Sequence, residues 1–290
     1  MCDEFTAADE NALLSRRQFG MIGAGAAVVA GFPGVAACAA EKHPATPLSE
    51  AIVSITTPDG MADALFVHPA SGKHPGVIMW PDIGGLRDAY KQMARRLAAD
   101  GFAVLVVNQY YRSAKSPVLA TFAEWRTPEG QAKITPMRAQ LTSDAIARDA
   151  KAFVAFLDGQ AAVDTARGIG SAGYCMGGPF TVLTAAAVPD RVRAAASFHG
   201  AALVTDQADS PHKLIASTKA SFLFAIAKGD DARAPGDKDA LRAAAAAAGR
   251  PAEIEVYPAE HGWCALDAPV YDQVQADRAW ARMLALFNAL

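Results

Sequence analysis

Cysteine is scarce in this sequence, charge of one sign is nowhere concentrated, and no apolar run is long enough for a firm membrane span. Four cysteines, Cys2, Cys38, Cys175 and Cys264, are too few and too scattered for a disulfide framework or a metal cluster. Lys and Arg number 27 against 30 Asp and Glu, a formal net charge of -3, which offers no footprint for nucleic acid. Hydrophobic residues at 52% and charged residues at 20% exclude intrinsic disorder. The 290 residues therefore predict a soluble globular protein whose partner is a small molecule.

The first forty residues have the layout of a bacterial export signal. The paired Arg16 and Arg17 stand two residues before Phe19, and an apolar run rich in glycine and alanine follows over residues 21–37. This run is too weakly hydrophobic for a stable membrane span and ends in small residues that signal peptidases accept. Paired arginines are typical of twin-arginine signals, which carry folded proteins across the inner membrane. We expect residues 1–39 to be a signal peptide and the twin-arginine export machinery to deliver the domain over 40–290 to the periplasm.

The exit site of this segment allows alternatives. Cleavage after Ala39 gives a soluble protein, whereas residues 35–38 loosely resemble a lipoprotein signal in which Cys38 is acylated and anchors the protein. A buried N-terminal helix with an incidental arginine pair is the third interpretation. We favour the soluble form.

Strands alternate with helices along the rest of the chain. A hairpin is predicted from two β-rich stretches around the turn Thr57-Pro58-Asp59-Gly60. Apolar runs and helical spacing predict further strands and helices, with strands over 76–80, 102–107, 168–174, 194–198, 221–227 and 252–257, and helices around 86–97, 142–157, from 177, 238–248 and 271–287. Such alternation predicts an α/β fold with a mostly parallel, doubly wound sheet and helices on both faces. Residues 113–135 are the least regular part and are placed to cover a site.

The strongest chemical signal is a cysteine between glycines, in Gly173-Tyr174-Cys175-Met176-Gly177-Gly178. An apolar strand precedes Cys175 and a helix follows it, which is the nucleophile-elbow arrangement with Cys in place of Ser. Small residues on both flanks let the tight turn present the thiol at the strand's end. The helix N-terminus favours thiolate, and the Met176 N–H points to where an oxyanion would form.

A thiolate nucleophile needs a base and an orienting acid, which in this fold follow it in the order acid, then histidine. Asp230 and Asp231 follow a strand that ends at residue 227, and the residues alone do not separate the two. His261 follows the strand over 252–257 and is the histidine whose chain position satisfies that order. We predict that His261 is the base.

These motifs together resemble the dienelactone hydrolase family of α/β-hydrolases from about residue 52 to residue 287. The resemblance implies the α/β-hydrolase fold and favours Asp231 over Asp230, because the spacing from Asp231 to Pro235 is similar to the family's acid loop. Within Asp82-Ile83-Gly84-Gly85, it implies that Asp82 contacts the resting thiol and that the Ile83 N–H joins the Met176 N–H in the oxyanion hole. Asp82 is alternatively a cap for the following helix.

The resemblance implies hydrolase chemistry more firmly than it implies a substrate. Dienelactone enzymes proper hold the substrate carboxylate with an arginine four residues past the histidine, where this chain has Ala265. We predict Tyr111 and Arg112, at the end of a strand, as substrate contacts, with Arg138 as a further cation. Either arginine is alternatively a solvated surface charge. The predicted reaction is hydrolysis of a small ester or lactone through a thioester on Cys175, without cofactor or metal, by a monomer.

Two functions other than ester hydrolysis also fit the sequence. One is a non-catalytic periplasmic binding protein that keeps the same fold. The other is a thiol redox protein in which Cys264, three residues past His261, resolves an oxidised Cys175. A compact buried side chain is the favoured interpretation of Cys264.

Overall fold

The computed structural model describes residues 46–290. The predicted export signal over residues 1–39, its cleavage site and the candidate lipidation site Cys38 lie outside the described residues. Over the described range, none of the helices combines the length and the apolar character needed to cross a lipid bilayer.

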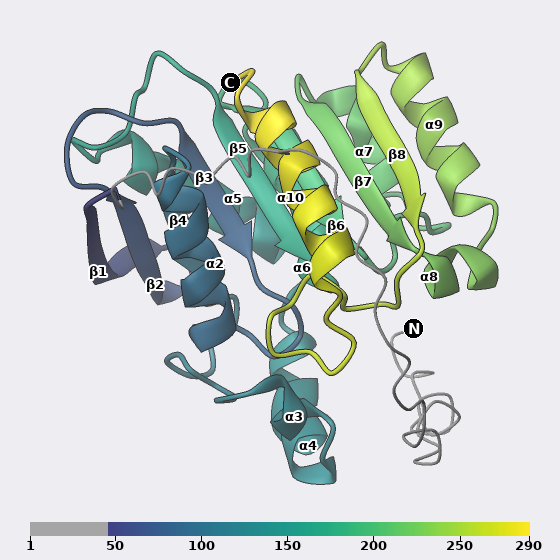
Figure 1. Ribbon diagram of the computed structural model, residues 1–290, viewed down its shortest axis with the longest axis horizontal. Coiled ribbons are helices and arrows are strands. Elements are labelled where there is room, and N and C mark those ends of the chain that lie inside the picture. Colours follow the sequence, from purple (N-terminus) through teal and green to yellow (C-terminus); the bar gives the residue numbers. More distant parts are fainter. Residues whose placement is uncertain (1–45) are drawn as a thin grey trace, which may run out of the picture. The chain divides into compact units, whose positions relative to one another are not determined.

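An eight-stranded sheet organises residues 46–290, in the order β1-β2-β4-β3-β5-β6-β7-β8 (Figure 1). Its strands are β1 (Leu48–Thr57), β2 (Gly60–Pro69), β3 (Gly76–Trp80), β4 (Ala103–Val107), β5 (Ile169–Tyr174), β6 (Val192–Phe198), β7 (Ser221–Ala227) and β8 (Ala252–Tyr257). Strand β2 pairs antiparallel with β1, with which it forms a hairpin, and also antiparallel with β4. The other strand pairings are parallel. The mostly parallel sheet predicted from the sequence is confirmed.

Helices cover both faces of this sheet. They are α2 (Asp88–Ala99), α3 (Phe122–Trp125), α4 (Pro128–Arg138), α5 (Ser143–Asp158), α6 (Gly177–Ala187), α7 (Pro211–Leu214), the 3-10 turn η1 (Ile215–Ser217), α8 (Lys228–Arg233), α9 (Asp237–Ala247) and α10 (Gln273–Phe287). In Figure 1, α2 and α10 lie in front of the sheet and α5 and α6 lie behind it. Two buried apolar clusters result, one on each face.

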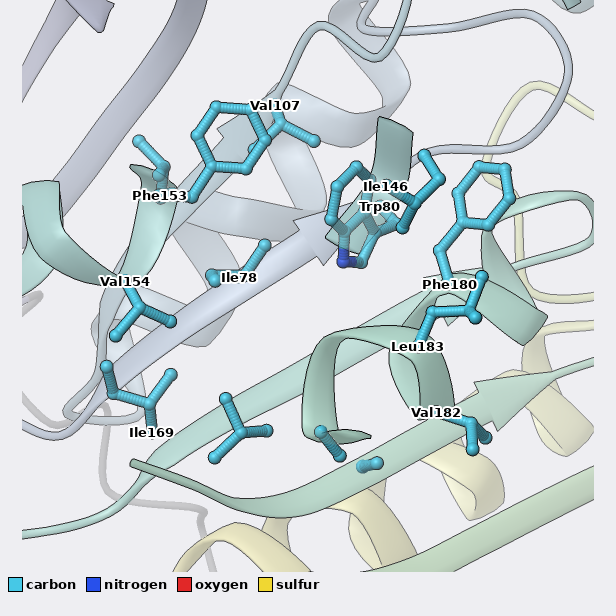
Figure 2. Close-up of a cluster of buried hydrophobic side chains, with 14 of the residues drawn as sticks. Ile78, Trp80, Val107, Ile146, Phe153, Val154, Ile169, Phe180, Val182 and Leu183 are labelled. Carbon is cyan, nitrogen blue, oxygen red and sulfur yellow. The ribbon is translucent and has the colours of Figure 1, made fainter. Parts of the chain in front are cut away.

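The cluster under α5 and α6 fixes the end of the sheet from which the candidate nucleophile projects. Figure 2 shows Trp80, the last residue of β3, between Phe153 of α5 and Phe180 of α6. The ring of Trp80 lies 5.7 Å and 5.6 Å from these two rings, and its Nε1 donates to Thr184 Oγ1 at 3.1 Å. Burial of large aromatic side chains is the main source of stability in such a core. The start of α6 is therefore held firmly against β3 and β5.

The segment predicted to be irregular contains two helices, α3 with 4 residues and α4 with 11. Thr121 and Glu124 form a capping box at the start of α3, and Thr127 Oγ1 accepts the Gly130 N–H at the start of α4. Helix α4 buries only Gly130 and Ile134, so it lacks the apolar stripe that reveals a helix in sequence. Figure 1 shows α3 and α4 beyond the carboxyl ends of the parallel strands, where ligands bind in such sheets.

Candidate active site

The candidate nucleophile stands on a sharp turn between β5 and α6. Cys175 has a φ of 52°, a left-handed conformation that strains a residue with a side chain. A Cβ atom added to Gly173 would lie 2.0 Å from the Gly177 carbonyl oxygen, and one added to Gly177 would lie 2.4 Å from the Trp80 oxygen. Both obstacles are backbone atoms that cannot rotate away. Glycine is therefore required at both positions, which gives the predicted elbow a steric basis.

Backbone hydrogen bonds hold this turn against the next strand. The Cys175 N–H donates to the Phe198 oxygen at 3.0 Å, and the Cys175 oxygen accepts the N–H groups of Gly178 at 2.9 Å and Ala201 at 3.2 Å. The Cys175 side chain is half-buried. The thiol is thus fixed at the carboxyl ends of β5 and β6 and remains accessible to a small ligand.

The carboxylate beside His261 belongs to Asp230, which corrects the prediction of Asp231. Asp230 Oδ2 accepts a hydrogen bond from His261 Nδ1 at 2.8 Å, and its other oxygen pairs with Arg233. Asp231 Oδ1 instead accepts from Lys238 Nζ at 2.6 Å. Helix α8 begins directly after β7, so consecutive side chains there point about 100° apart. One of the two carboxylates faces the histidine and the other faces α9.

His261 connects Asp230 to the nucleophile. The side chain of Cys175 is hydrogen-bonded to the imidazole. Burial by itself lowers the pKa of His261, but the negative charge on Cys175, and then Asp230, raise it to about 10. His261 is therefore a cation at neutral pH, paired with sulfur on one side and carboxylate on the other. Thiol nucleophiles are activated by this kind of arrangement.

A second histidine, which precedes Asp230 in the chain, packs behind His261. The ring of His199 lies 4.9 Å from that of His261 and 5.1 Å from that of Trp263. Burial and the charge of His261 hold the pKa of His199 well below its ordinary value, and within residues 46–290 neither ring nitrogen has a hydrogen-bond partner. His199 is thus a neutral ring that packs against His261. It follows β6 directly, but only the strand order places it beside Cys175.

The two predicted oxyanion donors come together because β3 and β5 are neighbours. Ile83 follows β3, Met176 follows β5, and both are buried. Tyr110, which no sequence motif marks, joins them. Its hydroxyl donates to the Ile83 oxygen at 2.8 Å and lies 3.8 Å from Met176 Sδ. Within residues 46–290, the N–H groups of Ile83 and Met176 donate to no other protein group. Two backbone donors are thus available to a ligand oxygen.

Asp82 has a different partner from the one predicted. Its two oxygens accept hydrogen bonds from Arg87 at 2.6 Å and 2.9 Å, and Oδ1 also accepts the Gly84 N–H at 2.8 Å. Arg87 is fully buried and needs a counter-charge. Its guanidinium therefore forms an ion pair with the Asp82 carboxylate, which was expected to contact the thiol. Asp82 does not cap α2 either, because Arg87 is the N-cap residue of that helix.

Tyr111 and Arg112, the predicted substrate contacts, connect structural elements instead. The Tyr111 hydroxyl lies 2.7 Å from Thr57 Oγ1 and donates to Asp149 Oδ1 at 2.7 Å. Arg112 pairs with Asp59 and with Asp149, each at 2.7 Å. The reason is the position of β4 beside the β1–β2 hairpin, which directs the residues after β4 toward the hairpin turn and α5. Arg112 supplies a counter-charge to the buried Asp149, and Tyr111 donates a hydrogen bond to it.

Arg138 at the end of α4 acts on the site at longer range. Burial raises the pKa of Tyr110, the charges of Asp82 and Cys175 raise it further, and the charge of Arg138 lowers it. Arg138 therefore contributes positive potential near the oxyanion donors.

Cys264 is buried in the apolar cluster on the α2 and α10 side, and burial raises the pKa of its thiol well above the ordinary value. It lines a small cavity of about 50 Å³ with Tyr174 and Trp280. Cys175 packs against the cluster on the other face of the sheet. These surroundings match the favoured interpretation of Cys264 as a compact apolar side chain.

Comparisons with known proteins agree with this architecture. The sequence profile described as the dienelactone hydrolase family matches residues 62–290. A Methylorubrum extorquens protein, provisionally named a carboxymethylenebutenolidase, is 29% identical over 242 residues, which cover 81% of this chain and 79% of that protein. A crystal structure from Klebsiella pneumoniae, provisionally named a dienelactone hydrolase, has a TM-score of 0.71 and 23% identity, covering 84% of this chain and 99% of that one. A dienelactone hydrolase-like promiscuous phosphotriesterase from metagenomic libraries has a TM-score of 0.67 and 22% identity, covering 83% and 98%. The chain therefore belongs to the dienelactone hydrolase family and is a hydrolase with the α/β-hydrolase fold.

Proposed function

We propose that this enzyme hydrolyses an ester or lactone of a small molecule by covalent catalysis, with Cys175 as nucleophile, His261 as proton carrier and Asp230 as orienting acid. One observation carries the proposal: a half-buried thiol on a strained elbow is hydrogen-bonded to a histidine that is itself hydrogen-bonded to a carboxylate. This is the geometric signature of an activated nucleophile. The acid in this proposal is Asp230, because Asp231 is paired with Lys238.

In the first half of the proposed reaction, the Cys175 thiolate attacks the carbonyl carbon and the electron pair of the C=O bond moves onto oxygen. The N–H groups of Ile83 and Met176 stabilise this oxyanion. When the intermediate collapses, the carbon–oxygen bond to the leaving alkoxide breaks and His261 protonates that alkoxide. The product is a thioester on Cys175, and for a lactone the alcohol stays attached to the acyl group.

In the second half, water attacks the thioester and gives a proton to His261, which Asp230 holds in the correct orientation. Collapse of this second intermediate breaks the carbon–sulfur bond and releases the carboxylic acid. The thiolate then pairs again with the His261 cation, so the enzyme returns to its starting state.

The substrate class is proposed from the family relationship. The related M. extorquens protein carries the name of a lactone hydrolase. We therefore propose a small lactone or ester as the substrate, and neither Tyr111 nor Arg112 contacts it in this proposal.

The proposal is tested by comparing wild-type protein with Cys175→Ala and Cys175→Ser on a panel of activated esters, lactones and a dienelactone. Turnover that depends on Cys175 supports the proposal and ranks the substrates. Absent turnover with slow alkylation of Cys175 at neutral pH would favour the non-catalytic binding protein. A reversible disulfide between Cys175 and Cys264 after mild oxidation, without esterase activity, would favour the redox protein.

We further propose that the chain is exported by the twin-arginine pathway. The motif at Arg16 and Arg17 supports this, and replacement of both by lysine, followed by cell fractionation, tests it. Retention of the doubly substituted protein in the cytoplasm is the expected result, and unchanged export would contradict the proposal.

A further inference from the structure

One buried guanidinium joins three segments around the site. Arg87 is fully buried, and its Nη1 and Nη2 donate to the two oxygens of Asp82 at 2.6 Å and 2.9 Å. On its other edge, Nε and Nη2 each donate to an oxygen of Asp267 at 2.7 Å. A single planar side chain thus makes two bidentate, charge-assisted contacts, the geometry for which arginine is best suited. We call Asp82, Arg87 and Asp267 the Arg87 bridge.

The first end of the Arg87 bridge fixes the loop that carries Ile83. Asp82 Oδ1 accepts the Gly84 N–H at 2.8 Å, so the carboxylate closes a turn around Ile83. The Asp82 backbone oxygen accepts from Gln109 Nε2 at 2.8 Å, which holds the same turn from the other side. The position of the Ile83 N–H therefore depends on how the Asp82 carboxylate is held.

The second end of the bridge fixes the chain after His261 and the start of α3. Asp267 lies six residues past His261, and its Oδ2 accepts the N–H of Phe122, the first residue of α3, at 2.9 Å. The Arg87 guanidinium also lies 5.5 Å from the centre of the Phe122 ring. The α3–α4 segment is therefore tied to the histidine loop at this point.

Stability alone does not explain such an arrangement. A buried ion pair is often no more stabilising than well-packed apolar residues, because desolvation offsets the attraction. Its directional hydrogen bonds, however, specify geometry. We propose that Arg87 and Asp267 are positioning residues for ester hydrolysis: the Arg87 bridge sets the Ile83 N–H at the distance from Cys175 and His261 that the developing oxyanion requires. This inference rests on the proposed function.

The role of the bridge can be separated from general damage to the site. Hydrolysis builds negative charge on a carbonyl oxygen and needs the Ile83 N–H. Alkylation of Cys175 by iodoacetamide displaces iodide from carbon and needs the thiolate but no oxyanion donor. A displaced Ile83 therefore slows ester turnover and leaves the rate of alkylation unchanged.

Asp267→Asn tests the inference, with Asp158→Asn as the matched control. Asp158 also makes a bidentate pair with an arginine, Arg191, at 2.8 Å and 3.0 Å, but this pair lies just before β6, at the amino ends of the parallel strands and away from the site. For a p-nitrophenyl ester, Asp267→Asn should lower kcat about tenfold or more, since loss of a whole oxyanion donor costs about 10²–10³-fold. The iodoacetamide rate should stay within about twofold, and Asp158→Asn should change both rates by no more than about twofold.

Two results would overturn the inference: a kcat for Asp267→Asn equal to that of Asp158→Asn, or equal losses in turnover and alkylation. If Asp267→Asn does not fold, Asp82→Asn combined with Arg87→Met removes both fully buried charges together, and the same ratio of rates is measured. Cys175→Ala separates the two proposals. If Cys175→Ala keeps its turnover, the proposed function fails; if it is inactive while Asp267→Asn is unaffected, only the bridge fails.

Discussion

Replacing Asp230 and its neighbour Asp231 one at a time by asparagine tests the assignment of the triad acid. Asp230 receives Arg233 on one oxygen and His261 on the other. An asparagine has one oxygen, and the guanidinium of Arg233, a pure donor, attracts it. The amide nitrogen then faces His261 Nδ1 and favours the tautomer with its proton on Nε2, which cannot accept a proton from the thiol.

The size of this effect follows from the contacts. Loss of the charge-assisted hydrogen bond costs about 1.5–3 kcal/mol, which is roughly 10–150-fold in rate. The wrong tautomer adds to this, and the same substitution in a Ser-His-Asp protease costs about 10⁴-fold. We therefore expect Asp230→Asn to lower kcat between about 10² and 10⁴-fold. Asp231→Asn removes a partly exposed pair with Lys238, and kcat should stay within about threefold.

The assay is steady-state turnover of one activated ester by both variants, with circular dichroism to confirm folding. The alkylation rate of Cys175 is recorded in parallel, because Asp230→Asn weakens the support of the His261 cation. Equal losses in the two variants, or a larger loss in Asp231→Asn, would refute the assignment of Asp230.

Three further predictions concern the site and its frame. Because the charge on Cys175 raises the pKa of His261 to about 10, Cys175→Ser should lower that pKa, and less His261 should be protonated at neutral pH; NMR titration of ¹⁵N-labelled histidine measures this, and an unchanged pKa would contradict the ion pair. Gly177→Ala places a Cβ atom 2.4 Å from the Trp80 oxygen, so denaturant unfolding should show a loss of about 3 kcal/mol or more, and wild-type stability would count against the steric argument. Arg112→Gln leaves the buried Asp149 uncompensated and should cost about 3–5 kcal/mol of stability without changing KM, whereas a raised KM at normal stability would restore Arg112 as a substrate contact.

The fold was predictable because its signals are local. The strands over 221–227 and 252–257 are short apolar runs with clear boundaries, and the structure places β7 and β8 over the same residues. Helix α3 was missed because it has only 4 residues, and α4 was missed because it buries few side chains, so their caps are the main signal. Propensity and periodicity do not reveal such helices.

The site residues were predictable only where a short sequence motif is enough to specify the local backbone geometry. The glycines around Cys175 specify the elbow, and His261 follows a clear strand, so the structure brings together two residues identified from local patterns. Which of Asp230 and Asp231 faces His261 depends on how α8 is rotated about its own axis, and no local sequence pattern specifies that rotation.

The ionic contacts around the site were not predictable in the same way. Arg87 and Asp267 are 180 residues apart, and neither stands in a recognisable motif. Asp82 was expected to contact the thiol, but its carboxylate pairs with the buried Arg87 instead. An unpaired guanidinium in the protein interior would cost much free energy. A motif can identify a residue near the site, but tertiary contacts of this kind determine what that residue does.

The central claim, a thioester on Cys175, is tested most directly by trapping it. The enzyme is mixed with an activated ester whose acyl group is hydrolysed only slowly from the enzyme. The mixture is quenched in acid during the initial burst of product release, digested and analysed by mass spectrometry. We expect the acyl mass on the peptide that contains Cys175, its removal by neutral hydroxylamine, and no turnover by Cys175→Ala. An acyl group on another residue, or full turnover by Cys175→Ala, would contradict it.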